Sequence, residues 1–426
     1  MAHSDLNSYQ FSFPFLSRLG VFIALAFSCL MLNTNPAQAQ DKNYTFTPAP
    51  DVWYNSVDGV RLGLRVLGEV EGTFKDGPHR LDAGIWLGTK FPELPVSYYL
   101  SFTEPIAAIS SFGNEGNVQL ISSIRTGYNE QKIALNKRWQ AGFDETRYKE
   151  LSLSFSQEKL IDYEYRPYNQ LWQNDWKSLV GADFVLSDFT ATGKFDANVI
   201  LLQNLNTTSE TFTVITLELK QQIELNQNFG IKLRVFGGFG SDNTAPEHLF
   251  GKSYRQPAKW LQNGFSRAKG TLPKNWLNDG LFHIAGGANL RGYTFQDFES
   301  LSNGGAILYT QTAAVNAEFE FPNPINHLFK SSVIGDFVHL SSYTFFDTGF
   351  FYRDSIQQTP DLVTDLQEFV SDAGIGFQFS LNIPDVLGKD RGFAVRYEIP
   401  FWLSDSGDES NFKFRSLIGI GAVISL

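Results

Sequence analysis

The sequence predicts an all-β fold, a transmembrane antiparallel β-barrel, and three observations favour it. Strand-like segments alternate apolar and polar residues, and many reach about ten residues, the length that a tilted strand needs to cross a bilayer. Aromatic residues make up 15% of the chain while its mean hydropathy is only −0.18, which alternation explains because each apolar residue has a polar neighbour. The only cysteine, Cys29, precedes a predicted export cleavage site, so the mature chain has no disulfide and needs a large cooperative structure.

The N-terminus has the pattern of a signal peptide over residues 1–39. An apolar run over 19–32 is followed by the small-residue cleavage site Ala37-Gln38-Ala39. The run is too short for a spanning helix, which needs about 20 residues. Lipoprotein processing at Cys29 is the alternative, and the apolar run that continues past this residue disfavours it.

Strand-like segments follow one another through residues 58–426, which we interpret as one barrel. A short periplasmic lead-in or plug is expected before them, over 40–57. Alternation and turn signals place fifteen strands at 59–68, 80–90, 96–104, 117–128, 132–139, 148–158, 177–189, 194–205, 211–223, 229–239, 309–321, 338–351, 370–381, 392–401 and 412–426. Single-chain bacterial barrels have an even number of strands, so one is missing, in the lead-in, at 106–112 or after Glu158.

The last three strands show two faces most clearly. Over 392–401 the residues Phe393, Val395, Tyr397, Ile399 and Phe401 alternate with Ala394, Arg396 and Glu398. A soluble β-sandwich alternates in the same way, with its apolar face on a core. Aromatic residues at strand ends, export without cysteine and an apolar strand at the last residue favour the membrane barrel instead.

A long polar loop over 241–305 carries the segment Gly286-Gly287-Ala288-Asn289-Leu290-Arg291-Gly292-Tyr293. Its glycines permit positive φ or the close approach of another surface. The guanidinium of Arg291 presents a planar fork that suits a carboxylate, and Glu318 and Asp347 are available on the two strands that follow. We expect the loop to fold into the barrel and hold Arg291 against these acids. The alternatives are a solvated loop charge and acids that only line the lumen.

The order of these motifs resembles the barrel of the BamA-type outer-membrane assembly superfamily, also called the bacterial surface antigen family. The resemblance covers about residues 229–426 and rests on Leu290-Arg291-Gly292-Tyr293, Glu318-Phe319-Glu320-Phe321-Pro322, Asp347-Thr348-Gly349, Gly374-Ile375-Gly376-Phe377 and Arg396-Tyr397-Glu398-Ile399-Pro400. It implies sixteen antiparallel strands, both termini in the periplasm and an extracellular loop folded into the lumen. It also implies contacts of Arg291 with Glu318 and Asp347.

The resemblance further implies the outer membrane of a Gram-negative bacterium, with outer-membrane lipid around the barrel, and a part in outer-membrane protein or lipid assembly or translocation. In that family the seam between the first and last strands is thought to open. Gly419 and Gly421 would weaken the last strand, or they let a lumen side chain or plug approach. The ending Gly421…Ile424…Leu426 resembles the C-terminal assembly signal of outer-membrane proteins, with Leu426 in place of the usual Phe.

The expected partners follow from a departure from that family. Residues 40–57 are too few for the periplasmic modules that its assembly factors carry. We therefore expect a separate periplasmic receptor-module protein and other assembly subunits as partners. The alternative functions are a passive pore or small-solute transporter, and a scaffold subunit of a larger outer-membrane complex.

We expect no enzymatic activity, no cofactor and no metal. Gly251-Lys252-Ser253 lacks the upstream glycine of a phosphate loop, no His-x-x-x-His pair occurs, and no Gly-x-Ser-x-Gly elbow occurs. An outer-membrane protease or acyl hydrolase with its site on strand ends is the remaining enzyme alternative. The net charge of −11 argues against nucleic-acid binding. It indicates acidic loops and an acidic lumen, or simply a solvated acidic surface.

Overall fold

The computed structural model describes most of the chain beyond the predicted leader. It covers residues 44–70, 79–90, 96–325, 338–353, 366–384, 390–407 and 410–424, apart from 112, 143, 162–164, 206–209 and 227. The predicted signal peptide over 1–39 and the terminal Leu426 lie outside these residues. Among the residues covered, no helix has the length and apolar composition needed to cross a membrane.

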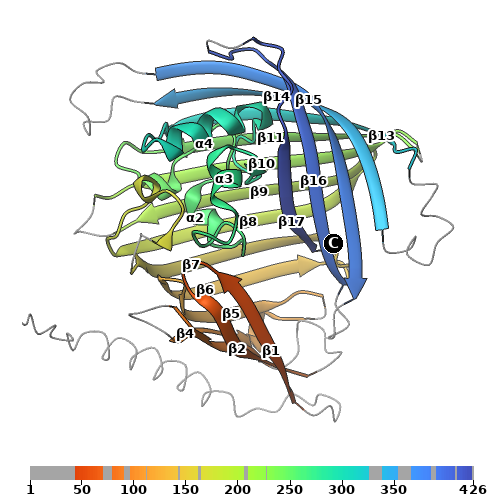
Figure 1. Ribbon diagram of the computed structural model, residues 1–426. Coiled ribbons are helices and arrows are strands. Elements are labelled where there is room, and N and C mark those ends of the chain that lie inside the picture. Colours follow the sequence, from red (N-terminus) through yellow and green to blue (C-terminus); the bar gives the residue numbers. More distant parts are fainter. Residues whose placement is uncertain are drawn as a thin grey trace, which may run out of the picture. The chain divides into compact units, whose positions relative to one another are not determined.

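The described strands form a single sheet in which each long strand pairs antiparallel with the next long strand along the chain (Figure 1). A two-residue strand, β12 (Phe282–His283), belongs to the long loop. The others are β1 (Thr45–Asn55), β2 (Gly59–Glu69), β3 (Arg80–Gly88), β4 (Val96–Pro105), β5 (Gly116–Arg125), β6 (Tyr128–Gln140), β7 (Tyr148–Leu160), β8 (Lys177–Thr190), β9 (Gly193–Asn204), β10 (Thr213–Glu224), β11 (Gly230–Gly240), β13 (Gln311–Pro322), β14 (Val338–Arg353), β15 (Leu366–Pro384), β16 (Asp390–Leu403) and β17 (Leu417–Ile424).

The sheet exposes apolar residues and buries polar ones. In β2, Val60, Leu62 and Leu64 are 41%, 50% and 47% exposed, whereas Arg61 between them is 7% exposed. In β10, Ile215 and Leu217 are likewise exposed while Thr216 is buried. A soluble sheet would place its apolar face against a core, so this inverted pattern is typical of strands whose outer side faces lipid.

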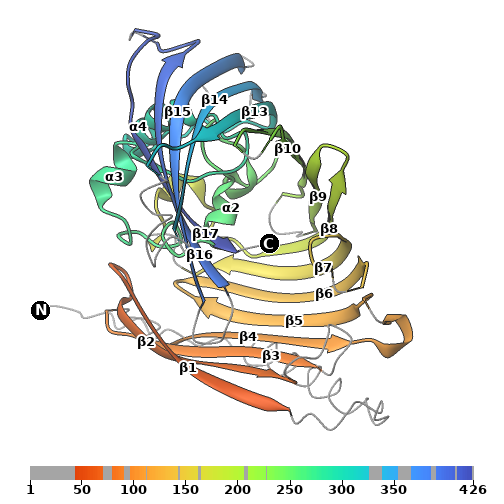
Figure 2. The same ribbon diagram turned by 90° about the vertical axis from the view of Figure 1, so that its right-hand side faces the viewer.

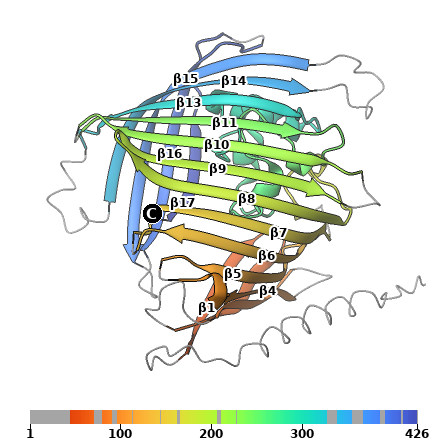
Figure 3. The ribbon, with the colours of Figure 1, turned by 180° about the vertical axis from the view of Figure 1, so that it is seen from behind.

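The loop between β11 and β13 packs on the polar side of the sheet. It contains three short helices, α2 (Pro257–Trp260), α3 (Lys274–Asn278) and α4 (Thr294–Ser302). Figure 2 shows them on the concave side of the strands, and Figure 3 shows the strands from behind, side by side in chain order. Trp260, Tyr254 and Phe298 pack edge to face and stacked within the loop, so the loop has an apolar core of its own.

The strand missing from the sequence-based count is β1, which lies inside the expected lead-in. Thr45–Asn55 pairs with β2 along its whole length, from Thr45 opposite Glu69 to Asn55 opposite Gly59. The expectation of a separate lead-in or plug over 40–57 was therefore wrong for 45–55. Pro48 and Pro50 obscured the strand, because proline lacks an N–H. Because Pro48 and Pro50 are two residues apart, the N–H donors that they lack would all lie on the same edge of the strand. Such a strand can be paired on its other edge only.

The predicted closed ring is open in the structure. Within the described residues β1 pairs only with β2, and no ladder joins β1 to β17. The other edge of β17 meets the loop instead. β12 pairs parallel with β17, Phe282 opposite Ile418 and His283 opposite Gly419, and the Ile418 N–H donates to the Leu281 carbonyl at 2.7 Å. A loop segment thus occupies the strand edge that ring closure requires.

Candidate functional site

The segment before Arg291 turns sharply, and its glycines are needed for that turn. Gly286 and Gly287 have φ values of 126° and 64°, a region that disfavours residues with a Cβ. A Cβ on Gly287 would also lie 3.0 Å from the Tyr254 carbonyl oxygen. Asn289, at φ 61°, accepts a hydrogen bond from the Gly286 N–H through its side chain at 2.9 Å. These contacts direct the next residues toward the sheet.

The motif itself is buried. Arg291–Tyr293 forms a single 3₁₀ turn that runs into α4. Leu290 and Tyr293 are 0% and 1% exposed and belong to the apolar cluster beneath the loop. Gly292 is required by space, because a Cβ there would lie 2.7 Å from the Cβ of Asp372. The turn therefore sits directly on β15.

Three carboxylates surround the guanidinium of Arg291, and we call this group the arginine anchor. Nε and Nη2 donate to the two oxygens of Asp347 at 2.8 and 2.9 Å, a bidentate pair. Nη1 donates to Glu318 at 2.7 Å and to Glu398 at 2.9 Å. The guanidinium carbon also lies 3.8 Å from the ring centre of Phe345, a cation–π contact. The anchor joins the loop to β13, β14 and β16.

Arg291 carries a fixed positive charge despite its 1% exposure. Burial alone would lower the pKa of Arg291, but the Coulomb attraction of Asp347 and Glu398 outweighs it and raises this pKa well above its usual value. All three carboxylates are themselves buried or nearly so. Removing the cation would leave these acids without their shared partner.

The structure brings together the predicted Arg291, Glu318 and Asp347, and it adds groups that the sequence argument missed. Glu398 was noted only as part of a motif, although it receives Arg291 and also the Tyr343 hydroxyl at 2.7 Å. Asn316 donates to Asp347 at 3.0 Å. Their inward positions in alternating strands were the available signal.

A further acid, Asp372, lies against the anchor with no hydrogen-bond partner on either side-chain oxygen in the described structure. It is fully buried and sits opposite Asp347 in the β14–β15 ladder. Two facing carboxyl groups leave the anchor richer in acids than in cations.

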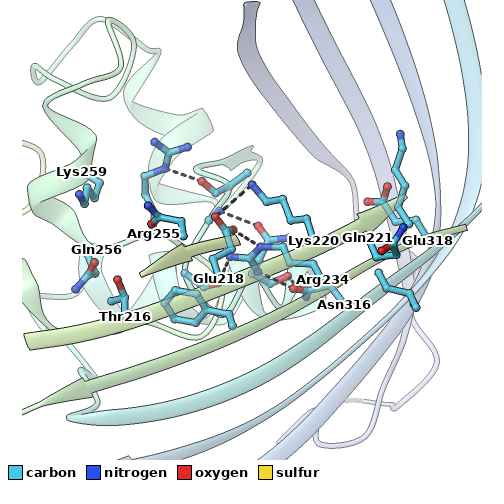
Figure 4. A pocket seen from close by; sticks show the side chains of 18 of the residues that line it. Thr216, Glu218, Lys220, Gln221, Arg234, Arg255, Gln256, Lys259, Asn316 and Glu318 are labelled. Carbon is cyan, nitrogen blue, oxygen red and sulfur yellow. Dashed lines mark hydrogen bonds and ion pairs between the residues drawn. The ribbon is translucent and has the colours of Figure 1, made fainter. Parts of the chain in front are cut away.

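A cavity of about 520 Å³ adjoins the anchor on its loop side (Figure 4). Gly286 and Gly287 border this cavity. Glu318 belongs to the anchor and also lines the cavity, where it accepts hydrogen bonds from Arg396 at 3.1 and 3.3 Å. Six basic side chains and two acidic ones line it: Lys220, Lys232, Arg234, Arg255, Lys259 and Arg396 with Glu218 and Glu318. The expectation of an acidic lumen is therefore wrong for this cavity.

A second cavity of about 490 Å³ shares Lys259 and Gln256 with the first. Its charged lining is mixed, with Arg125, Lys132, Lys259 and Arg267 against Glu130, Glu158 and Asp183. The space between loop and sheet is thus polar and divided by the loop. Within the described residues, no group of three His, Cys, Asp or Glu side chains has the geometry of a metal site.

The seam residues lie where the last strand meets its neighbours. Gly419 pairs with Arg396 on β16 and with His283 on β12, while Gly421 and Ile424 pair with Ala394 and Arg391. A Cβ on Gly419 would meet the Cβ of Arg396 at an ordinary 3.5 Å, so close packing does not require this glycine. Its role in weakening the seam, and the role of Gly421, stay predictions.

Comparisons with known proteins give structural likeness without sequence matches. No protein-family model and no curated protein matches the chain. The crystal structure of BamA from Haemophilus ducreyi lacking POTRA domains 1–3 is similar over 94% of this chain and 78% of its own, at 14% identity and a TM-score of 0.47. Pseudomonas aeruginosa OccK10 (OpdN) is similar over 90% and 100%, at 10% identity and a TM-score of 0.31. The NanC porin is similar over 73% of this chain and 100% of its own, at 8% identity and a TM-score of 0.22.

Replacement of Arg291 by Ala is expected to release the loop. Breaking a buried ion pair by removing one partner is destabilising by about 3–5 kcal/mol. We expect the amides of residues 286–302 to open more readily, by more than about 100-fold in the opening equilibrium. Hydrogen–deuterium exchange of the detergent-solubilised protein measures this directly.

The matched control is Lys274→Ala, which removes an exposed cation from the same loop. Lys252 is unsuitable because it forms an ion pair with Glu368. Equal exchange in the Arg291 and Lys274 variants would show that Arg291 is only one solvated loop charge among others.

Acid is expected to weaken the loop through His248, which is buried in the turn Pro246–His248. Burial and the nearby cations Lys177 and Lys259 lower the pKa of His248 to about 3. An unfolded histidine titrates near pH 6.5, roughly, so from about pH 6.5 down to 3 the open loop binds a proton that the closed loop does not. Stability therefore falls as the pH falls.

We expect urea titrations followed by tryptophan fluorescence to show a lower midpoint at about pH 5 than at about pH 7.5. His248→Gln should reduce that difference, whereas His79→Gln, at a partly exposed position, should not. An unchanged pH dependence in the His248 variant would refute the assignment.

Proposed function

We propose that the chain is a β-barrel of the Gram-negative outer membrane that takes part in the assembly or translocation of outer-membrane proteins or lipids. The observation that carries the proposal is the arginine anchor, which holds the loop inside the sheet through carboxylates on three separate strands. An element fixed in this way can respond as a unit when those strands shift. No catalytic role is assigned to any residue.

The membrane part of the proposal is supported by the distribution of side chains. Large apolar residues are exposed along one face of most strands, among them Leu153, Phe155, Val199, Leu201, Val235, Val315 and Phe346. Contiguous apolar surface of this extent would favour aggregation in water. The opposite face carries hydroxyls, amides and charges, as expected for a lumen.

The assembly part is supported by the junction of β12 with β17. The last strand is paired on one side with β16 and on the other with only two loop residues. A two-residue parallel pairing is less stable than a long antiparallel ladder, so it separates more readily. A strand edge exposed in this way is a template for another strand. The anchored loop would hold that edge covered until a substrate or partner displaces it.

A passive pore or small-solute transporter is the second candidate, favoured by the two polar cavities of about 520 and 490 Å³. The basic excess of the first cavity would give such a pore a preference for anions. A scaffold subunit of a larger complex is the third. The proposed partner for the assembly role is a separate protein with periplasmic receptor modules, which copurification from outer membranes would reveal.

Single-channel recording in planar bilayers distinguishes the first two functions. We expect the wild-type protein to give a small or flickering current, because the anchored loop divides the lumen. Arg291→Ala should raise the conductance or the open probability, while Lys274→Ala should leave the trace unchanged. A large, steady, anion-selective conductance of the wild type, unaffected by Arg291→Ala, would favour the passive pore and contradict the proposal.

A further inference from the structure

Four arginines come together on the polar side of the sheet, away from the anchor. Arg61 is the third residue of β2, Arg125 ends β5, Arg166 follows β7, and Arg267 belongs to the long loop. We call them the arginine cluster. Neither the proposed function nor the anchor gives these four cations a role.

The arginine cluster lacks direct carboxylate partners among the described residues. No ion pair within 4.0 Å joins a cluster arginine to a carboxylate in the described structure, whereas Arg65, on the same face of β2, pairs with Asp82 at 3.1 Å. Glu130 and Asp82 act on Arg125 through their charges without a direct contact. The acids that act on Arg61 are Asp51 and Asp58, and both accept hydrogen bonds from other groups. Asp51 accepts a hydrogen bond from the Trp86 indole at 2.7 Å, and Asp58 accepts one from the Thr126 hydroxyl at 3.4 Å.

Burial acts on both loop members of the cluster, and repulsion from the other arginines acts on Arg267. Burial, followed by repulsion from Arg125, Arg61 and Arg166, lowers the pKa of Arg267 to about 9. Burial lowers the pKa of Arg166 to about 10. An arginine whose pKa falls this far is destabilised in its charged form, and a bound anion would remove that penalty.

A cavity of about 160 Å³ opens between members of the cluster. Arg61, Arg267 and Thr126 line it together with Asp51, Trp53, Gly264 and Ala268. Arg61 is only 7% exposed, and its Nε is buried without any hydrogen-bond acceptor. A buried guanidinium N–H without an acceptor is rare and costly, so the unpaired Nε of Arg61 points to a ligand that supplies oxygen atoms.

We propose that this cavity binds a phosphate group, carried by a lipid headgroup or present as free phosphate. Arginine forks match phosphate oxygens in geometry and charge. The cavity far exceeds the roughly 10–15 Å³ that one water needs. A phosphate anion there, beside Arg267, would supply the acceptor that the Arg61 Nε lacks. The bound group would bridge β2 and the long loop.

Arg166 acts here as a positioning residue. Its Nη1 donates to the backbone carbonyl of Arg267, and its Nη2 donates to the carbonyl of Thr126 at 2.6 Å. It thereby holds the loop against the β5–β6 turn, which brings Arg267 to the cavity. Aromatic contacts steady two of the others, Arg61 over Trp86 at 4.7 Å and Arg125 over Tyr99 at 4.5 Å. These contacts orient the cluster but supply no oxygen acceptor.

The direct test is a titration of the folded protein with inorganic phosphate in zwitterionic detergent, at constant ionic strength set with chloride, followed by calorimetry. We expect saturable binding that Arg61→Gln weakens at least about tenfold. Arg65→Gln is the matched control, since it removes an arginine from the same strand and face that already has a carboxylate, and it should bind as the wild type does. An equal loss of phosphate affinity in the Arg61 and Arg65 variants would overturn the proposal. So would the absence of binding both to free phosphate in detergent and to lipid phosphate in nanodiscs.

A second arm distinguishes the source of the phosphate and protects against misfolding of the Arg61 variant. Nanodiscs that contain phosphatidic acid, whose headgroup is a phosphate monoester, are compared with nanodiscs of phosphatidylcholine, whose phosphodiester is neutralised by choline. A higher unfolding temperature in the former alone, lost in Arg267→Gln, identifies a lipid headgroup. Without phosphate, Arg267→Gln should unfold at a higher temperature than the wild type because repulsion is relieved. Phosphate should raise the unfolding temperature of the wild type but not that of Arg267→Gln. An unfolding temperature of Arg267→Gln that rises with phosphate as in the wild type contradicts the proposal.

Discussion

The structure depends on one buried cation and the carboxylates that hold it. Moving a guanidinium and several carboxylates out of water is expensive, and only close, multiply hydrogen-bonded contacts offset the desolvation. Arg291 meets that requirement with four side-chain hydrogen bonds to Asp347, Glu318 and Glu398. Because the three acids come from β13, β14 and β16, the anchor also fixes the relative positions of those strands beneath the loop.

The inverted sheet makes such an anchor possible. Its buried face is polar, with hydroxyl, amide and charged side chains, so a loop rich in charge and glycine can pack there without an apolar core beneath every residue. The loop supplies its own apolar cluster around Trp260 and Phe298. The remaining space is divided into charged cavities. In the cavity of about 160 Å³ beside Arg61, the lining holds two arginines and one acid.

Alternation along the strands was enough to predict the sheet, and one local motif was enough to predict the anchor's core. Arg291, Glu318 and Asp347 were foreseeable because each lies in a short distinctive segment. Glu398 was not, since it lies 107 residues from Arg291 and only the fold brings the two together. β1 was missed because its prolines mask a strand paired on one side. The open seam could not be predicted, because it involves the pairing of β12 with β17 over only two residues. A segment this short has no detectable periodicity.

A double-mutant cycle between Arg291 and Asp347 tests the central claim most directly. The free energy of unfolding in urea is measured for the wild type, Arg291→Ala, Asp347→Ala and the double variant. Residues in direct, buried contact show coupling of about 0.5–3 kcal/mol, and the bidentate pair should fall in the upper part of that range. Additive effects, with coupling below about 0.3 kcal/mol, would show that the guanidinium is not held inside the sheet by this carboxylate.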